Sequence, residues 1–423
     1  MFMSKRLLLL LGFGLLLCGL SAQQRAMHHE AGRQNAPQQL DKPYVILISL
    51  DGYRWDYTAR FQPPNLSRLI ARGVQAEGLI PCFPSKTYPN HYSIATGMTP
   101  ERHNLVDNSY FDPEKGEMYT MSKRRLVEDG SWYGGIPIWV QAEKEGMVSA
   151  SFFFVGSEAD IHGIRPTYWY TYDGSVPEMI RVQQALDWLR LPAEIRPHLI
   201  SMYFSNMDDA GHRFGPNNDA KLSEALMGLD TALGRLFDGV DSLGLPVHFI
   251  IVSDHGMAEV APEQFLPIDP LLNDSLYTTA NNGALAHFYL RPGADPDSVF
   301  QALQARATHA RIYKTQDFPH YHNNIGNPRL GDFIALPDFP YYYSDLRRMS
   351  LLRRGGPKGE HGFDPAITDL HGIFYAQGPL LKSGLTLPRF QNVHIYPLIC
   401  RLLGLSIPPD IDGRPEVLAP ALR

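Results

Sequence analysis

The feature that most constrains the fold is an alternation of short runs rich in Val, Ile and Phe with longer amphipathic stretches. The clearest apolar runs predict strands at 44–50, 148–154, 198–204 and 247–253. The clearest helices are predicted at 178–191 and 219–237, the second with leucines at three- and four-residue spacing. Strands that alternate with helices predict a layered α/β sheet covered by helices on both faces.

Composition narrows the class of protein further. Apolar residues make up 44% of the chain and charged residues only 19%, which excludes a disordered or coiled-coil chain. The formal net charge of −6 argues against binding of a nucleic-acid polymer, because such binding needs a basic surplus. We expect one domain over 40–423, in which 273–354 lacks a clear helix-strand rhythm and is interpreted as a cap-like insertion.

The N-terminus predicts export. Lys5 and Arg6 precede an apolar run over 7–20 that is too short to span a bilayer comfortably, and Ala22 offers a small residue for cleavage. We therefore expect residues 1–22 to be a signal peptide. The mature protein is then periplasmic or secreted, without a stable membrane anchor, because no second apolar run is long enough to cross a membrane.

The sequence also predicts the nature of the segment after the signal peptide and limits the state of the cysteines. Residues 23–39 are polar and without periodicity, and we interpret them as a flexible lead-in. Cys82 and Cys400 remain after the signal peptide, and the sequence allows either a single disulfide or two buried thiols. The oligomeric state is not predicted.

Acidic residues follow three of the four predicted strands. Asp51 comes directly after the first, Asp208 follows the third, and Asp254 with His255 follows the fourth. The carboxyl ends of parallel strands lie along one edge of a sheet, where ligands bind, so we expect these side chains to converge. Each Asp alone would be interpreted as a cap of the next turn. Three such cases with adjoining histidines favour a site.

The residue types at this edge suit a metal. Asp208 and His212 are four residues apart, so both can face one ion, and His361 lies in a glycine-rich loop that can reach the site. Aspartate and histidine without thiolate are ligands of catalytic zinc, which keeps a position open for substrate.

Thr87 is the candidate nucleophile. A helix is predicted over 89–96, with Pro89 in its first turn and Gly97 as its stop. Thr87 would then lie at the helix N-terminus, where free N–H groups and the helix dipole favour an alkoxide or a bound phosphoryl oxygen. The alternative is that its hydroxyl only caps the helix.

Several motifs, taken together and in order, resemble the nucleotide pyrophosphatase/phosphodiesterase family of the alkaline phosphatase superfamily. They are Asp51-Gly52, FPSKTYPNHYSIATG at 83–97, Asp107-Asn108, GGIPIW at 134–139, MDDAGH at 207–212, SDHGM at 253–257 and HGFDP at 361–365. The resemblance implies an alkaline-phosphatase-like fold and a bacterial secreted member with the catalytic domain only. Met207 departs from the family, which commonly has a proline there.

The resemblance also implies a mechanism that uses two Zn²⁺ ions and a phospho-threonine intermediate at Thr87. One zinc would be held by Asp51, Thr87, Asp254 and His255, and the other by Asp208, His212 and His361. Asn108 matches the residue that donates to a non-bridging phosphoryl oxygen. Counting back from Gly174, Trp169 matches the aromatic that faces a nucleobase, and Tyr88 would lie on the other side of the base.

Three functions are compatible with the sequence. The first is hydrolysis of nucleotide phosphodiester or pyrophosphate bonds, with small-molecule nucleotides or other phosphodiesters as substrates. The second is release of a choline-type phospholipid headgroup by the same core. The third is a metal- or ligand-binding protein that has lost catalysis, which the complete set of ligand positions disfavours.

Overall fold

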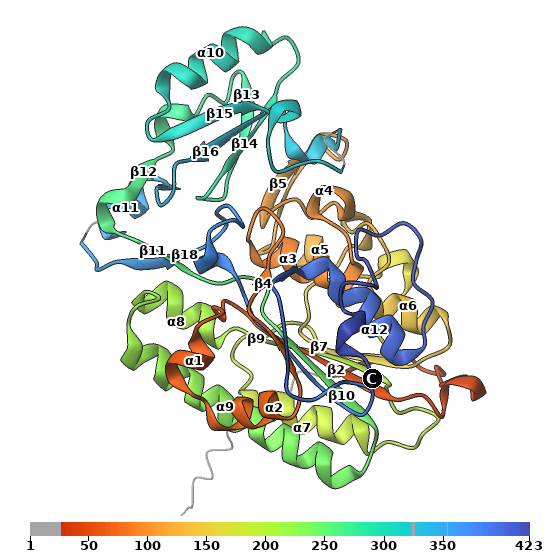
Figure 1. Cartoon of the computed structure of the whole chain (residues 1–423). Coiled ribbons are helices and arrows are strands. Elements are labelled where there is room, and N and C mark those ends of the chain that lie inside the picture. Colours follow the sequence, from red (N-terminus) through yellow and green to blue (C-terminus); the bar gives the residue numbers. More distant parts are fainter. Residues whose placement is uncertain (1–26, 324–325, 353) are drawn as a thin grey trace, which may run out of the picture.

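A nine-stranded mixed sheet forms the centre of the molecule (Figure 1). The computed structural model describes residues 27–323, 326–352 and 354–423, so the predicted signal peptide lies outside the described residues. The strand order is β1-β8-β7-β9-β2-β10-β19-β3-β20. Within the described ranges, no helix is both long and apolar enough to cross a membrane.

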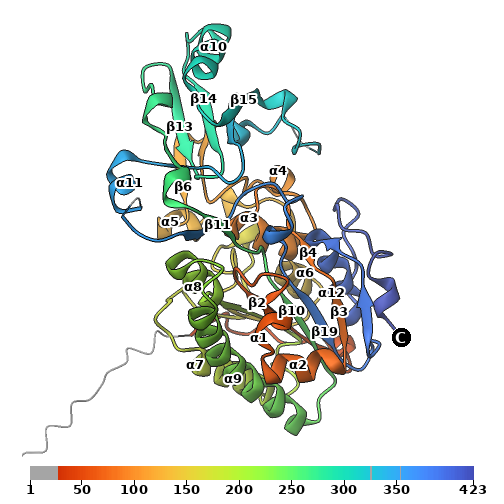
Figure 2. The ribbon, with the colours of Figure 1, turned by 60° about the vertical axis from the view of Figure 1, so that its left-hand side comes forward.

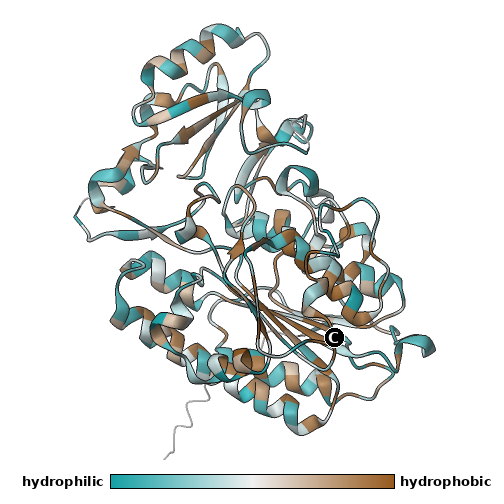
Figure 3. Ribbon diagram, viewed as in Figure 1, coloured by the Kyte–Doolittle hydropathy of each residue, from teal (hydrophilic) through white to brown (hydrophobic). Residues whose placement is uncertain are grey.

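The four predicted strands are the inner strands of this sheet. They are β2 (Tyr44–Leu50), β7 (Ser149–Phe152), β9 (Leu199–Phe204) and β10 (Val247–Val252), and they pair in parallel. Every residue of these strands is buried. Strands covered on both faces need apolar side chains in both directions, which explains their continuous apolar runs. Figure 3 shows them as the most hydrophobic part of the ribbon.

Helices cover both faces of the sheet (Figures 1 and 2). One face carries α2 (Pro64–Ala71), α7 (Glu178–Leu189) and α9 (Asp219–Leu243), whose apolar sides share one core with the sheet. The other face carries α3 (Thr87–Thr96), α6 (Ile138–Lys144) and α12 (Ile395–Leu403), which share a second core. The predicted layered α/β fold is confirmed.

Shorter helices and strands complete the fold. The helices are α1 (Tyr57–Phe61), α4 (Pro100–His103), α5 (Arg124–Val127), α8 (Asn206–Phe214) and α11 (Leu346–Leu352). The strands are β3 (Val74–Ala76), β4 (Leu79–Ile80), β5 (Ser109–Asp112), β6 (Glu117–Thr120), β8 (Tyr168–Trp169), β11 (Ala258–Val260), β12 (Phe265–Pro267), β17 (Tyr342–Ser344), β18 (Lys358–Glu360), β19 (Phe374–Gln377), β20 (Leu385–Leu387) and β21 (Phe390–Gln391).

The 273–354 segment contains a second sheet with its own core, although no helix-strand rhythm was expected there. Its four antiparallel strands are β13 (Tyr277–Asn281), β14 (Ala286–Leu290), β16 (Phe333–Pro337) and β15 (Ala310–Lys314), covered by α10 (Pro296–Arg306). Figure 1 shows this unit at the top of the molecule, above β5.

The described part of the lead-in is held by the fold, contrary to the expectation of flexibility. His28–His29 form the edge strand β1, which pairs with β8, and Pro37–Gln39 form a turn of 3₁₀-helix. The pairing satisfies backbone groups that a free tail would leave to solvent. Cys82 and Cys400 are both free and buried, so of the two alternatives the structure has the thiols.

Candidate active site

The predicted site residues meet at the carboxyl edge of the parallel strands. Asp51 follows β2 directly, Asp254 and His255 follow β10, and α8, which carries Asp208, begins just after β9. Gly52 permits this convergence: its φ is +66°, and a Cβ there would lie 2.7 Å from the Cα of Asp208. Any other residue at position 52 would push the turn after β2 away from α8.

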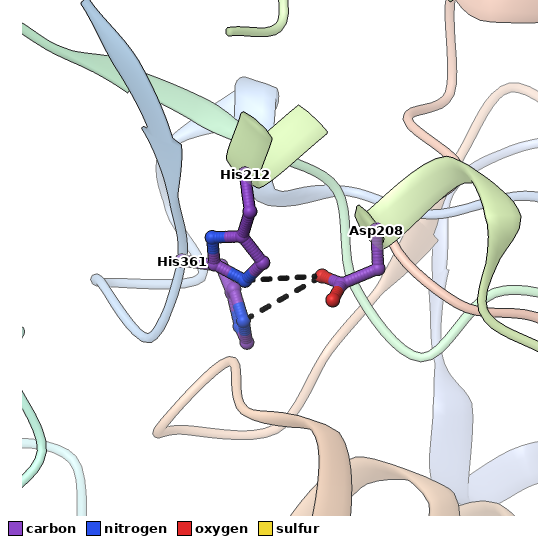
Figure 4. Close-up of side chains that lie close together, drawn as sticks. All are labelled: Asp208, His212 and His361. Carbon is purple, nitrogen blue, oxygen red and sulfur yellow. Dashed lines mark ion pairs between the residues drawn. The ribbon is translucent and has the colours of Figure 1, made fainter. Parts of the chain in front are cut away.

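The first cluster of candidate ligands consists of Asp208, His212 and His361 (Figure 4). Asp208 and His212 lie one turn apart on α8, and His361 enters from the end of β18. The Oδ1 atom of Asp208 lies 3.4 Å from Nε2 of His212 and 3.7 Å from Nε2 of His361. One ion could therefore contact all three side chains.

The second cluster consists of Asp51, Asp254 and His255, all buried. Nε2 of His255 lies 3.0 Å from Oδ2 of Asp254 and 3.5 Å from Oδ1 of Asp51. The two clusters adjoin, because the rings of His255 and His361 stack with centroids 3.6 Å apart.

Backbone carbonyls fix the orientation of the three imidazoles. A carbonyl can only accept, so each ring carries a hydrogen on Nδ1 and turns Nε2 towards the carboxylates. His212, His255 and His361 donate in this way to the carbonyls of Gly359, Gly256 and Ser85, at 2.7, 2.8 and 2.8 Å. Metal-binding histidines are typically held by such a second hydrogen bond.

The carboxylates of both clusters leave oxygens without a donor. Oδ1 of Asp51, Oδ1 of Asp208 and Oδ2 of Asp254 are buried, and no described residue donates a hydrogen bond to them. Buried polar atoms normally have partners, so unpaired oxygens that face imidazole nitrogens fit a pair of divalent cations. The residues present therefore suit metal ions.

The electrostatics of the protein alone favour the neutral forms of Asp51, Asp208 and His361. Burial, together with repulsion from Asp254 and Asp208, raises the pKa of Asp51 well above its ordinary value, and burial also raises that of Asp208. Burial, with His255 beside it, lowers the pKa of His361 well below its ordinary value. Bound cations would reverse the penalty on the carboxylates by compensating their charge.

Thr87 is the first residue of α3, at the junction of the clusters. Its Oγ1 lies 3.4 Å from Nε2 of His255. The helix cap is Lys86 rather than Thr87, and no side chain forms a cap hydrogen bond. The alternative in which Thr87 merely caps the helix is therefore excluded, and its hydroxyl is available to a ligand.

Asn108 lies beside the same helix end. Its Oδ1 accepts the N–H of Tyr88 at 2.9 Å, so the carbonyl side of the amide is used by α3. The amide nitrogen remains as a donor.

Two neighbouring groups that the sequence analysis missed also hold the clusters. The hydroxyl of Tyr203, on β9, donates to Oδ2 of Asp51 at 2.6 Å. Nδ1 of His91 lies 2.8 Å from the carbonyl oxygen of Thr87 and 3.2 Å from Oδ2 of Asp254. The spacing of four residues between Thr87 and His91 on a helix is the signal that could have found the latter.

A cavity of about 420 Å³ opens from the clusters. Asp51, Thr87 and Asp208 line one end of it. The remaining wall carries aromatic and charged side chains, among them Tyr88, Phe153, Tyr172, Arg124 and Glu158. Arg124 and Glu158 form an ion pair.

The structure does not bring Trp169 to this cavity. Trp169 lies within β8, where its ring stacks on His28 with centroids 3.9 Å apart and an interplanar angle of 13°. Tyr172 lines the cavity instead. Strand β8 ends at Trp169, and each extended residue advances the chain by about 3.3 Å, so Tyr172, three residues further along, reaches the edge where the site lies.

A layered α/β fold that gathers two Asp/His clusters around a threonine hydroxyl defines a hydrolase of phosphoric esters. A profile of the type I phosphodiesterase/nucleotide pyrophosphatase family matches residues 45–364. The chain belongs to this family and is a phosphoric diester hydrolase.

Its relatives agree with this assignment. An uncharacterized pyrophosphatase/phosphodiesterase of Schizosaccharomyces pombe is 33% identical over 393 residues, which cover 90% of this chain and 80% of that protein. Ectonucleotide pyrophosphatase/phosphodiesterase family member 1 of Rattus norvegicus is 32% identical over 391 residues, which cover 89% of this chain but only 42% of the rat protein. The chain thus spans less than half of that relative.

A solved structure is also similar. Murine ectonucleotide pyrophosphatase/phosphodiesterase 5, as an inactive threonine-to-alanine variant in complex with AMP, has a TM-score of 0.83 and 27% sequence identity. The similarity covers 90% of this chain and 100% of that one. The alkaline-phosphatase-like fold implied by the sequence is confirmed.

Proposed function

We propose that the protein is a zinc-dependent phosphodiesterase that cleaves nucleotide phosphodiester or pyrophosphate bonds through a phospho-threonine intermediate at Thr87. The observation that carries the proposal is the position of Thr87 Oγ1, which lies at a helix N-terminus and 3.4 Å from a histidine of one ligand cluster. A murine relative with its threonine replaced by alanine is inactive, which supports a threonine nucleophile here.

Zinc suits the donor set, which consists of imidazole nitrogens and carboxylate oxygens without thiolate. Asp51, Asp254 and His255 would hold one ion, with Thr87 as a further ligand, and Asp208, His212 and His361 the other. When bound, the ions supply positive charge that neutralises the phosphate and lowers the pKa of the Thr87 hydroxyl.

Thr87 then acts in two displacements. Its hydroxyl gives up a proton to solvent as the oxygen forms a bond to phosphorus, the bond to the leaving alcohol or phosphate breaks, and a leaving alcohol takes a proton from solvent. A water molecule next attacks the phospho-threonine, which releases the nucleoside monophosphate and restores the hydroxyl. The amide nitrogen of Asn108 donates to a non-bridging oxygen throughout, where charge increases in the transition state.

The cavity wall favours a nucleotide over a lipid headgroup. Tyr88 and Tyr172 both line the cavity beside Thr87, and we assign to them the flanking of the nucleobase. The ion pair of Arg124 and Glu158 provides polar groups deeper along this wall. The murine relative binds AMP, which supports the same substrate class.

The site of action follows from the N-terminal sequence. We propose that residues 1–22 are removed and that the mature enzyme works in the periplasm or as a secreted protein on small-molecule substrates. Residues 40–423 would form one catalytic domain in which 273–354 is the cap-like insertion.

A substrate panel tests the proposal directly. We expect kcat/KM for a p-nitrophenyl nucleotide diester to exceed that for p-nitrophenyl phosphate and for p-nitrophenyl phosphocholine. A preference for the monoester would contradict the diesterase assignment, because Asn108 is a neutral donor suited to a single negative charge. A preference for the choline diester would favour the lipid alternative.

A further inference from the structure

We propose that Asn282, on the cap-like insertion, is a positioning residue that holds Asn108 in place for the reaction. This inference rests on the proposed function, in which Asn108 donates to the phosphoryl oxygen. It gives the insertion a role in catalysis although none of its described residues lines the cavity.

The loop that carries Asn108 lies outside the main sheet. Asn108 precedes β5, which pairs only with β6 among the described strands. Strand β13 of the insertion lies beside β5, as Figure 1 shows. The position of Asn108 therefore depends on contacts with the insertion.

Asn282 forms two hydrogen bonds with the backbone of Ser109, the residue that follows Asn108. Its Nδ2 donates to the carbonyl of Ser109 at 2.7 Å, and its Oδ1 accepts the N–H of Ser109 at 3.1 Å. Two hydrogen bonds from one planar amide fix both the position and the orientation of that backbone segment.

Asp107 holds the backbone on the other side, and His287 of the insertion lies beside it without a hydrogen bond between the two side chains. Oδ1 of Asp107 accepts the N–H of Asn108 at 2.7 Å, and its Oδ2 lies 3.4 Å from Nε2 of His287. The side chains of Asp107 and His287 are fully buried. Nδ1 of His287 donates to the carbonyl of Leu330 at 2.9 Å, so the ring is anchored within the insertion.

These contacts help to position the side-chain amide nitrogen of Asn108. The hydrogen bond from the N–H of Tyr88 holds Oδ1 of Asn108, and the backbone of 107–109 sets where the amide lies relative to that bond. An oxyanion donor works over a narrow range of distance, so a small displacement of this backbone weakens the transition state more than substrate binding. Asn282 does not line the cavity, and its two hydrogen bonds to Ser109 give it a path to the reaction through the backbone that carries Asn108.

A double-mutant cycle with a nucleotide diester tests the proposal. We expect Asn108→Ala to lower kcat/KM by about 100-fold, a loss typical of one oxyanion donor. Asn282→Ala should lower kcat about 10-fold with little change in KM, yet lower it less than about twofold when Asn108 is already alanine, because residues that act through one another are not additive.

The variants include a matched control and a milder change. Asn281→Ala alters the same turn but removes a side chain that accepts a hydrogen bond from the N–H of Gly283, and it should leave kcat unchanged. Asn282→Asp keeps the acceptor for Ser109 and loses the donor, so it should lose less activity than Asn282→Ala. Thermal unfolding and metal content establish that each variant is folded and loaded.

The outcomes distinguish failure of the positioning role of Asn282 from failure of the proposed diesterase function. Equal losses from Asn282→Ala in both backgrounds, or no loss in the unmodified enzyme, would overturn the positioning role while the enzyme remains an active diesterase. Full activity of Asn108→Ala would overturn the positioning role together with the role of Asn108. Absence of diesterase activity from the unmodified, metal-loaded enzyme would contradict the proposed function itself.

Discussion

At the scale of single residues, Thr87 carries the account of catalysis. We expect Thr87→Ala to abolish turnover of a nucleotide diester while the protein still binds metal, because the remaining side chains of both clusters persist. Thr87→Ser should retain measurable activity, since the hydroxyl survives. The measurements are steady-state rates and elemental analysis of each variant. Full activity of Thr87→Ala would mean that water attacks phosphorus directly.

Tyr172 carries the assignment of the nucleobase site. Stacking of a base on an aromatic ring contributes about 1–3 kcal/mol. Tyr172→Ala should therefore raise KM for a nucleotide diester by roughly tenfold, at about 1.4 kcal/mol per factor of ten, and affect a diester without a base less. Trp169→Ala is the control, and its KM should stay near the wild-type value. An equal loss on both substrates for Tyr172→Ala would assign it to the fold.

The sequence allowed the ligands to be predicted better than the base-binding residues. Asp51 and Asp254 lie at strand ends, where the direction of the chain fixes their position, and the structure brings both into one cluster. Trp169 was placed by counting along a motif, and an offset of three residues moves a side chain from the edge of the sheet into a strand. Tyr203 was missed because its contact with Asp51 is formed only when distant segments pack together, and the same holds for the contact of His91 with Asp254.

At the scale of elements, the turn after β2 determines the distance between the two clusters. Gly52→Ala should lower metal occupancy and the free energy of unfolding, because the added Cβ meets the Asp208 backbone at 2.7 Å and the φ of +66° is strained. Gly116→Ala is the matched control: its φ is +62°, and no described atom lies within 4 Å of the added Cβ. Backbone strain alone costs about 1–3 kcal/mol, and only Gly52→Ala should also reduce activity. Equal occupancy in both variants would contradict this role.

The strands of the insertion could not be predicted from the sequence. Inner strands such as β2 and β10 were predictable because burial on both faces requires a continuous apolar run. Strands β13 and β15 have partly exposed residues and therefore a weaker apolar pattern. The sheet that contains them is joined by the pairing of β14 with β16, segments more than 30 residues apart, which local periodicity does not report.

At the scale of the whole molecule, bound metal should couple stability to pH. Without metal, the raised pKa values of Asp51 and Asp208 mean that folding favours their protonated forms, so stability falls as pH rises above the ordinary aspartate range. The raised pKa of His255, which Asp254 causes against the effect of burial, acts in the same direction. His361, whose pKa is lowered, is neutral in both states above its ordinary value and adds no slope there.

We therefore expect the metal-free protein to lose thermal stability as pH rises through the range above the ordinary aspartate and histidine pKa values, while the metal-loaded protein does not. The gap in Tm between loaded and chelator-treated protein should widen with pH. Thermal unfolding of both forms across this range is the measurement. A gap that narrows with rising pH would show that the clusters do not bind cations through these carboxylates.

The central claim is that two clusters hold two metal ions around Thr87. Its most direct test is elemental analysis of purified, active protein beside the His361→Ala variant. The account predicts about two zinc ions per chain in the active protein, one for each cluster. It predicts about one in His361→Ala, with diesterase activity lost and the fold retained. One zinc ion or none in fully active protein would contradict the account.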